Sequence, residues 1–191
     1  ACGIEGTILH TSDQGGSWKR QSSGTSANLN SIQFLDAGNG CAVGDGGVIL
    51  RTNDGGATWA NRSVITLENL IGVWFTGADN GFVVGTNGLL IRTTNQGATW
   101  FAVSSHTGAI LHAVHFSDQQ TGVAVGDGGT VLKTSDGGSS WRSVARVTAA
   151  RLNTVRFSGP STVFAAGPGG VVITSTNGGD SWGVQGPATG A

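Results

Sequence analysis

The sequence predicts an all-β fold, a β-propeller built from five 41-residue repeats. Three observations support this prediction. Five tryptophans recur every 41 residues, glycine makes up 34 of the 191 residues, and no segment follows a helical period. Glycine at this frequency, without a collagen-like period, is typical of many tight turns between short strands.

An eight-residue segment ends at each of these tryptophans, and we call it the Trp motif. Its copies read TSDQGGSW, TNDGGATW, TTNQGATW, TSDGGSSW and STNGGDSW, and they end at Trp18, Trp59, Trp100, Trp141 and Trp182. Stacked supersecondary units produce self-similarity at this interval, and a stacked array behaves as one object. We therefore expect a single domain over 1–191, with repeats at approximately 1–28, 29–69, 70–110, 111–151 and 152–191.

Residues 29–64 show how one repeat is organised. Four strands are expected, at 29–36, 41–45, 48–52 and 58–64, and each of the intervening segments is rich in glycine, aspartate or asparagine. Large and small residues recur in columns, such as phenylalanine at 34, 75, 116 and 157, and small residues at 31, 72, 113 and 154. Both faces of a blade must pack against neighbours, so these columns indicate packing rather than chemistry.

The first repeat lacks one strand. The second, third and fourth strands occur five times, but the inner strand occurs only four times, near 29, 70, 111 and 152. Three explanations are open: residues upstream of Ala1 are absent from this chain, another copy or a partner donates the strand, or the first blade is three-stranded with unpaired backbone. The second explanation implies self-association that completes the first blade.

The composition excludes several classes of function. The net charge is −1 and charged residues make up 11% of the chain, so no overall field attracts nucleic acid or an anionic membrane. No apolar run reaches the 18 or more residues that a transmembrane helix needs.

A hydrogen-bonding role is predicted for the polar residues of the Trp motif. The third position of the motif offers a side-chain oxygen to the backbone N–H groups of a turn, while the tryptophan buries apolar area between blades. The residues at this third position are Asp13, Asp54, Asn95, Asp136 and Asn177. Because asparagine keeps the acceptor without the charge, we expect neither a metal site nor acid–base chemistry here, and no cofactor.

The motif pattern S/T-x-D/N-x-G-x-S/T-W resembles the Asp-box, or bacterial neuraminidase repeat. Its combination with L-x-x-[IV]-x-F and the turn VGDGG resembles the photosystem II stability and assembly factor family and its bacterial relatives. The resemblance covers essentially the whole chain. It implies a noncatalytic β-propeller of the periplasm, thylakoid lumen or cell exterior that binds other proteins. The best-known members have seven blades, whereas this chain has five repeats.

An enzyme is not expected, although the Asp-box also occurs in sialidases and other glycoside hydrolases. The chain has no tyrosine to serve as a sialidase nucleophile. Its two glutamates are Glu5 and Glu68, and most aspartates recur in turns, where an architectural role is favoured. His112 and His115 lie three apart on an expected inner strand, so they face opposite sides of the sheet and do not share a metal. No catalytic residue is assigned.

Binding is expected where the repeats differ. The column of residues at 33, 74, 115 and 156 lies on the inner strands near the central channel, and Trp74 is the best aromatic anchor, unless it only fills space between blades. His115 and Arg156 complete this set of candidates. Further candidates on one rim of the disc are Lys19, Arg20, Arg62, Arg142, Arg146 and Arg151, which are either a protein-binding face or solvated charge.

These observations favour a noncatalytic extracytoplasmic interaction or assembly module whose partner is a protein, including a membrane complex. A carbohydrate-binding propeller and a structural subunit of a multichain extracellular assembly are the alternatives. The sequence does not indicate whether five repeats close a ring or form part of a larger one.

Overall fold

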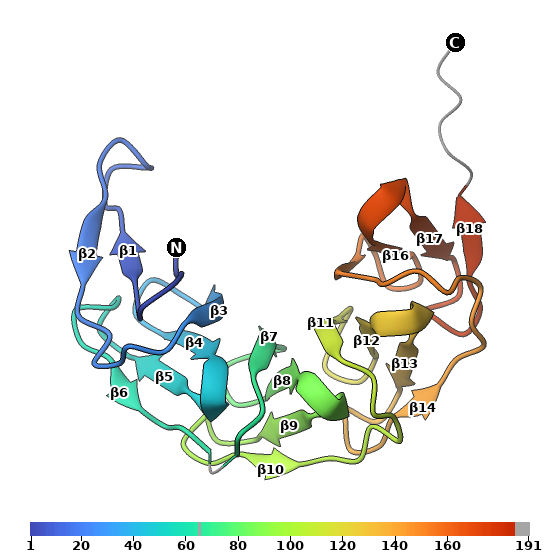
Figure 1. Ribbon diagram of the computed structural model, residues 1–191, viewed down its shortest axis with the longest axis horizontal. Coiled ribbons are helices and arrows are strands. Elements are labelled where there is room, and N and C mark those ends of the chain that lie inside the picture. The colour runs from blue at the N-terminus through green and yellow to red at the C-terminus, as the bar shows by residue number, and fades with distance from the viewer. Residues whose placement is uncertain (65, 186–191) are drawn as a thin grey trace.

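The five repeats fold into five antiparallel sheets that follow one another along an open arc (Figure 1). The computed structural model describes residues 1–64 and 66–185. Sheets two to five have four strands each, and the strands of every sheet are hydrogen-bonded in chain order. The predicted all-β propeller architecture is confirmed.

Four of the sheets repeat one arrangement. The second sheet contains β3 (Leu29–Phe34), β4 (Gly40–Gly44), β5 (Ile49–Thr52) and β6 (Ala60–Asn61). The third contains β7 (Leu70–Phe75), β8 (Gly81–Gly85), β9 (Leu90–Thr93) and β10 (Phe101–Ala102). The fourth contains β11 (Leu111–Phe116), β12 (Gly122–Gly126), β13 (Val131–Thr134) and β14 (Arg142–Ser143). The fifth contains β15 (Thr154–Phe157), β16 (Val163–Ala166), β17 (Val172–Ser175) and β18 (Gly183–Gln185).

The first sheet is incomplete among the described residues, as predicted. It consists of β1 (Ile8–His10) and β2 (Lys19–Gln21), and one isolated bridge joins Cys2 to Ile8. No strand of the described chain occupies the inner position of this sheet.

The fourth strand of the second repeat is shorter than the sequence indicates. In the second repeat it was expected at 58–64, but β6 covers Ala60–Asn61. The chain beyond it still follows β5, because the N–H of Arg62 donates to the oxygen of Ile49 at 2.7 Å. The Ser63 hydroxyl then accepts the N–H of Ile49 at 3.2 Å, so a side chain replaces the regular backbone pairing.

A single 3₁₀ turn joins the second and third strands of each complete sheet: η1 (Asp45–Gly47), η2 (Thr86–Gly88), η3 (Asp127–Gly129) and η4 (Pro168–Gly170). In η3, Gly129 has φ +69°, and a Cβ on it would lie 1.9 Å from the Thr148 oxygen. Glycine is therefore required there for space as well as for backbone conformation.

Neighbouring sheets pack through the phenylalanine column. Phe116 of β11 stacks on Phe82 of the preceding sheet with centroids 4.3 Å apart, and meets Trp141 of its own repeat edge-on at 5.8 Å. The small residue expected at Gly72 is needed for close approach, since a Cβ there would lie 3.0 Å from the oxygen of His112 on the next inner strand. The core is thus a series of layers between successive sheets.

The two outermost sheets lack this cover on one side. Trp18 is 50% exposed whereas Trp141 is 3% exposed, because no inner-strand phenylalanine packs on Trp18. Phe164 of β16 is 42% exposed, while Phe82, its counterpart in the third repeat, is 1% exposed beneath the following sheet. Figure 1 shows these sheets at the separate ends of the arc, with β3, β7 and β11 towards its concave side.

Among the residues that the structure describes, none forms a helix long and apolar enough to span a membrane. The expectation of one domain over 1–191 stays a prediction, and residues 186–191 of the last repeat lie outside the described part of the chain.

Candidate binding surfaces

The Trp motif aspartates are engaged in hydrogen bonds within their own turns. Asp54 accepts the N–H of Thr58 at 2.9 Å and the Thr58 hydroxyl at 2.6 Å, and Thr52 donates to the same carboxylate at 2.7 Å. Asp13 and Asp136 make the same contacts with their own neighbours. The hydrogen bonds from the motif hydroxyl and N–H groups lower the pKa of each of these three carboxyls to about 2.

In the other two motifs an asparagine accepts the equivalent hydrogen bonds. The Oδ1 of Asn95 accepts the N–H of Thr99 at 3.0 Å and the Thr93 hydroxyl at 2.9 Å, and its amide donates to the Thr99 hydroxyl at 2.8 Å. Asn177 repeats this pattern with Ser175 and Ser181. The turn needs an acceptor oxygen and not a charge. Residues 1–64 and 66–185 contain no cluster of three or more histidine, cysteine, aspartate or glutamate side chains that could hold a metal ion.

The second-turn carboxylates bind the inner strand of their own repeat. Asp45 accepts hydrogen bonds from the amides of Asn28 at 2.9 Å and Asn30 at 2.8 Å. Asp127 lies 2.8 Å from Nε2 of His112. These contacts give the two carboxylates a structural role in holding the second turn to the inner strand.

The inner-strand column, Gln33, Trp74, His115 and Arg156, links successive sheets. The rings of Trp74 and His115 lie 4.0 Å apart between centroids, and the Arg156 guanidinium lies 5.3 Å from the centroid of the Trp74 ring. Gln33 and His115 each accept the N–H of the phenylalanine on the next inner strand, Phe75 at 2.7 Å and Phe157 at 3.4 Å. Three of the sequence candidates therefore form one cluster.

The chemistry of this cluster suits recognition of a polar or aromatic group. Burial, and then the charge of Arg156, lower the pKa of His115 to about 4, so its imidazole is neutral at pH 7. Trp74 is half-buried, and its Nε1 has no hydrogen-bond partner within the described chain. The Nε1 atoms of Trp100 and Trp141 are likewise buried without a partner in the described chain, so this feature does not distinguish Trp74.

The six rim cations do not form one continuous group. Arg142 pairs with Asp180 of the next Trp motif, and Lys133 binds the same carboxylate at 2.7 Å. Arg20 donates to the oxygen of Glu5 at 3.5 Å. Lys19, Arg146 and Arg151 are exposed and make no ion pair with any described residue. Arg62 lines a cavity.

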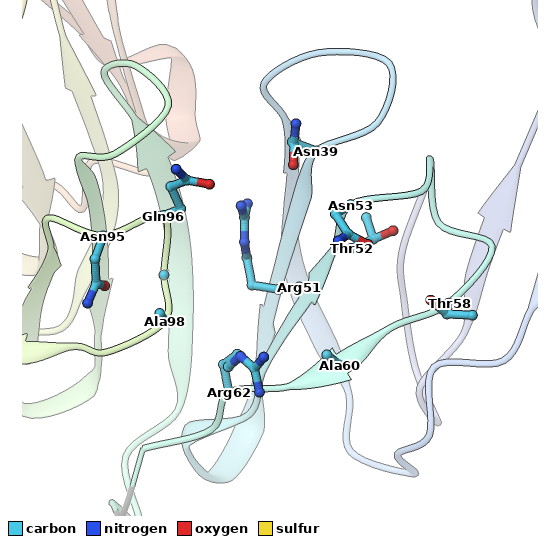
Figure 2. Close-up of a pocket in the computed structure, with 11 residues that line it drawn as sticks. Asn39, Arg51, Thr52, Asn53, Thr58, Ala60, Arg62, Asn95, Gln96 and Ala98 are labelled. Atoms are coloured by element: carbon cyan, nitrogen blue, oxygen red, sulfur yellow. The ribbon is translucent and has the colours of Figure 1, made fainter.

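That cavity, of about 260 Å³, lies between the second and third sheets (Figure 2). Figure 2 shows the Arg51 side chain in the space between the strands of the second repeat and the turn that carries Gln96. Two arginines, four side-chain amides and two threonines line it, with no carboxylate. Sequence reasoning missed this site because Arg51 belongs to a repeated basic column, with Arg92 and Lys133, that was assigned no chemistry of its own.

A scan against family models gives a match to the family described as photosynthesis system II assembly factor YCF48, over residues 18–108 and 99–185. The two matches together span most of the chain. The chain belongs to the YCF48 family. The resemblance inferred from the Trp motif and the glycine turns is thereby confirmed.

Solved structures show the same fold at low identity. YCF48 from Cyanidioschyzon merolae is 22% identical, with a TM-score of 0.71, over 91% of this chain and 64% of that one. A structure of YCF48 bound to D1 peptide is 18% identical, with a TM-score of 0.62, over 82% of this chain and 66% of that one. This YCF48-family chain thus spans less than two thirds of these relatives.

A glycoside hydrolase has the same architecture. The GH74 xyloglucanase from Xanthomonas campestris is 14% identical, with a TM-score of 0.74, over 94% of this chain and 34% of that one. No curated protein matches the chain. The YCF48 family and the propeller fold are thus shown.

Proposed function

We propose that this YCF48-family chain is a noncatalytic, extracytoplasmic module that binds a segment of another protein during the assembly of a complex. The inner-strand cluster of Trp74, His115 and Arg156 is the observation that carries the proposal. It combines aromatic rings with an arginine, and tryptophan and arginine are enriched where proteins bind one another most tightly. The related YCF48 structure with a bound D1 peptide supports a peptide as the ligand.

The lowered pKa values of seven of the eleven acidic side chains support a noncatalytic role. A glycosidase needs one carboxylic acid whose pKa is raised so that it can donate a proton near neutral pH. In this chain the pKa values of Asp13, Asp54 and Asp136 are lowered to about 2 by hydrogen bonds inside the Trp motifs. Asp36, Glu68, Asp118 and Asp180 are lowered as well.

The extracytoplasmic location rests on the family resemblance, and the basic residues Lys19, Arg20, Arg62, Arg146 and Arg151 are proposed as auxiliary contacts for the partner. Arg142 is a weaker candidate than the sequence suggested, because Asp180 already binds it. Fractionation of the native cells with an antibody against the chain tests the location. Recovery in the cytoplasmic fraction would reject it.

Quantitative affinity enrichment from a detergent-solubilised membrane fraction tests the binding role. The double variant Trp74→Ala/Arg156→Gln should lose the proteins that the unchanged chain enriches, and cross-links from the unchanged chain should map to the inner strands. Phe101→Ala is the matched control, since it removes a 60% exposed aromatic side chain from the outer strand β10. Equal enrichment by all three proteins would reject the inner-strand cluster as the binding surface.

Carbohydrate binding is the second candidate, favoured by the shared architecture with the GH74 xyloglucanase. A glycan array that includes xyloglucan oligosaccharides, together with an assay for released reducing sugar, separates the two. Saturable sugar binding that Trp74→Ala abolishes would replace the protein-binding proposal, and release of reducing sugar would end the noncatalytic one.

A further inference from the structure

We infer that the cavity between the second and third sheets is a binding site for a carboxylate of a peptide ligand, held by Arg51 and Arg62. This site is separate from the inner-strand cluster and does not depend on the function proposed above. The inference rests on comparison with the equivalent place in another repeat of the same chain, where the protein supplies a carboxylate itself.

A basic residue on the third strand of each of three repeats reaches towards the next sheet. These residues are Arg51 on β5, Arg92 on β9 and Lys133 on β13. Lys133 binds Asp180 of the next Trp motif at 2.7 Å, and Arg92 donates to Ser139, the preceding counterpart of Asp180, at 2.8 Å. Both cations therefore find a side-chain acceptor in the next sheet.

Arg51 differs, because the corresponding residue of the next Trp motif is Ala98. Its guanidinium lies 5.3 Å from the centroid of the Phe75 ring and donates to a backbone oxygen, that of Gly40, at 3.2 Å. No hydrogen bond or ion pair joins Arg51 to an acidic side chain of the described chain. A guanidinium has five N–H donors, so most of the hydrogen-bonding capacity of Arg51 is unused.

Two small residues open the cavity. In the register of the sheets, Ala60 lies opposite Arg51, whereas Arg142 lies opposite Lys133. Ala60 and Ala98 thus stand where Arg142 and Asp180 stand between the fourth and fifth sheets, and the space that those two side chains would take is empty. Arg62 directly follows the end of β6, lines the cavity and brings a second guanidinium.

The lining selects an anion of planar shape. The charge of Arg51 helps to lower the pKa of Asp36. The carboxylate of Asp36 is already bound, however, by the N–H groups of Gly38 and Asn39 and by the Asn39 amide. The amide of Gln96 donates to Asp79 at 3.1 Å. The charge of Arg51 and Arg62 is therefore not neutralised within the cavity, and arginine pairs with carboxylates through two parallel hydrogen bonds.

Titration of the ¹⁵N-labelled protein with three tripeptides tests the site. Acetyl-Gly-Asp-Gly-amide offers a side-chain carboxylate, acetyl-Gly-Gly-Gly with a free acid end offers a terminal one, and acetyl-Gly-Asn-Gly-amide offers none. Saturable shifts of the Arg51 and Arg62 Nε–H signals with either acid peptide, absent with the asparagine peptide, support the site and identify which carboxylate it takes. Equal responses to all three peptides would overturn it.

Two variants give the matched controls. Ala98→Asp places in this cavity the carboxylate that Asp180 provides elsewhere, so it should weaken binding of the acid peptide at least about tenfold. Arg62→Val installs the residue found at the equivalent positions Val103 and Val144, and should weaken binding similarly without loss of fold. If neither variant changes the affinity of the acid peptide while both remain folded, the cavity is not the carboxylate site.

The opposite substitution, of the acidic residue by alanine, provides an independent test. Asp180→Ala removes the carboxylate shared by Lys133 and Arg142 and should create a second site between the fourth and fifth sheets. Acid-peptide shifts should then also occur at Arg142. Their absence in a folded Asp180→Ala variant would contradict the equivalence of the two places.

Discussion

The indole ring of Trp74 and the imidazole ring of His115 lie with centroids 4.0 Å apart and planes inclined by 35°, although the two residues belong to different repeats. This pair joins the inner strands β7 and β11 and carries Arg156 over its tryptophan face. Because one member of the pair is a buried base, the stability of the stack depends on pH.

His115→Gln tests this dependence. The pKa of His115 is lowered to about 4 from 6.5, so between these values the unfolded chain binds a proton that the folded chain does not. The free energy of unfolding should therefore fall as the pH decreases from about 6.5 towards about 4, and the variant should lose this contribution. Urea denaturation at pH 7 and pH 5 measures the difference.

Gln33 shows that glutamine suits this position, since it accepts the N–H of Phe75 as His115 accepts that of Phe157. The variant should therefore fold normally at pH 7. An unchanged pH dependence in His115→Gln would mean that other groups cause it.

Alanine substitutions at Gly128 and Gly129 distinguish the cost of backbone strain from the cost of a steric clash. Both have positive φ, +61° and +69°, but a Cβ on Gly128 meets no atom closer than 3.8 Å while one on Gly129 would lie 1.9 Å from a backbone oxygen. Gly128→Ala should cost about 1–2 kcal/mol of unfolding free energy. Gly129→Ala should cost more than about 3 kcal/mol.

Thermal and urea unfolding of the two variants measure these costs. Gly128→Asn is a further control, because Asn87 occupies the same place in η2 with φ +51°. Equal costs for the two alanine variants would show that the turn can move away from Thr148.

Trp141→Ala and Trp18→Ala compare one motif position in two environments. Trp141 is 3% exposed and packs edge-on against Phe82 and Phe116, so its loss should cost about 3–5 kcal/mol. Trp18 is half-exposed, so its removal should cost much less. Chemical denaturation monitored by circular dichroism is the measurement, and equal losses would contradict the layered packing described above.

Asp136→Asn and Asp136→Ala test the role of the motif oxygen. Asparagine should preserve the turn as Asn95 does, whereas alanine should cost about 1–2 kcal/mol through lost hydrogen bonds. Since the pKa of Asp136 is lowered from 3.8 to about 2, its contribution is complete above about pH 4 and is lost as the pH falls towards 2. Acid unfolding curves of the Asn variant should show a smaller drop in this range. A large loss of stability in Asp136→Asn at pH 7 would assign the charge an essential role.

The sequence predicted the features that repeat. The interval between the tryptophans predicted the number of blades. The glycine turns predicted the boundaries of the inner three strands of the second repeat to within a few residues. A hydrogen-bonding role for the Trp motif oxygen could be predicted because asparagine and aspartate alternate at one position. Features that depend on neighbouring sheets were harder to predict.

Contacts between successive repeats were missed because alignment of the repeats compares equivalent positions, whereas the contacts join different ones. Arg142 was placed among the free rim cations, but the carboxylate that binds it, Asp180, comes from the next Trp motif. The cavity escaped notice for the same reason, since it results from alanine at both 60 and 98. Comparing the basic residues of the third strands, Arg51 and Lys133, with the next Trp motif would have pointed to Ala98 and to Asp180.

Arg92 and Lys133 each bind a side chain of the following sheet. These contacts therefore also determine which segments of the chain can be exchanged between related propellers. A graft cut at the boundaries of the sequence repeats would separate each of these cations from its acceptor at one junction. Chimeras among such propellers should instead be cut within a sheet, so that a donor segment carries the third strand of one blade together with the Trp motif of the next.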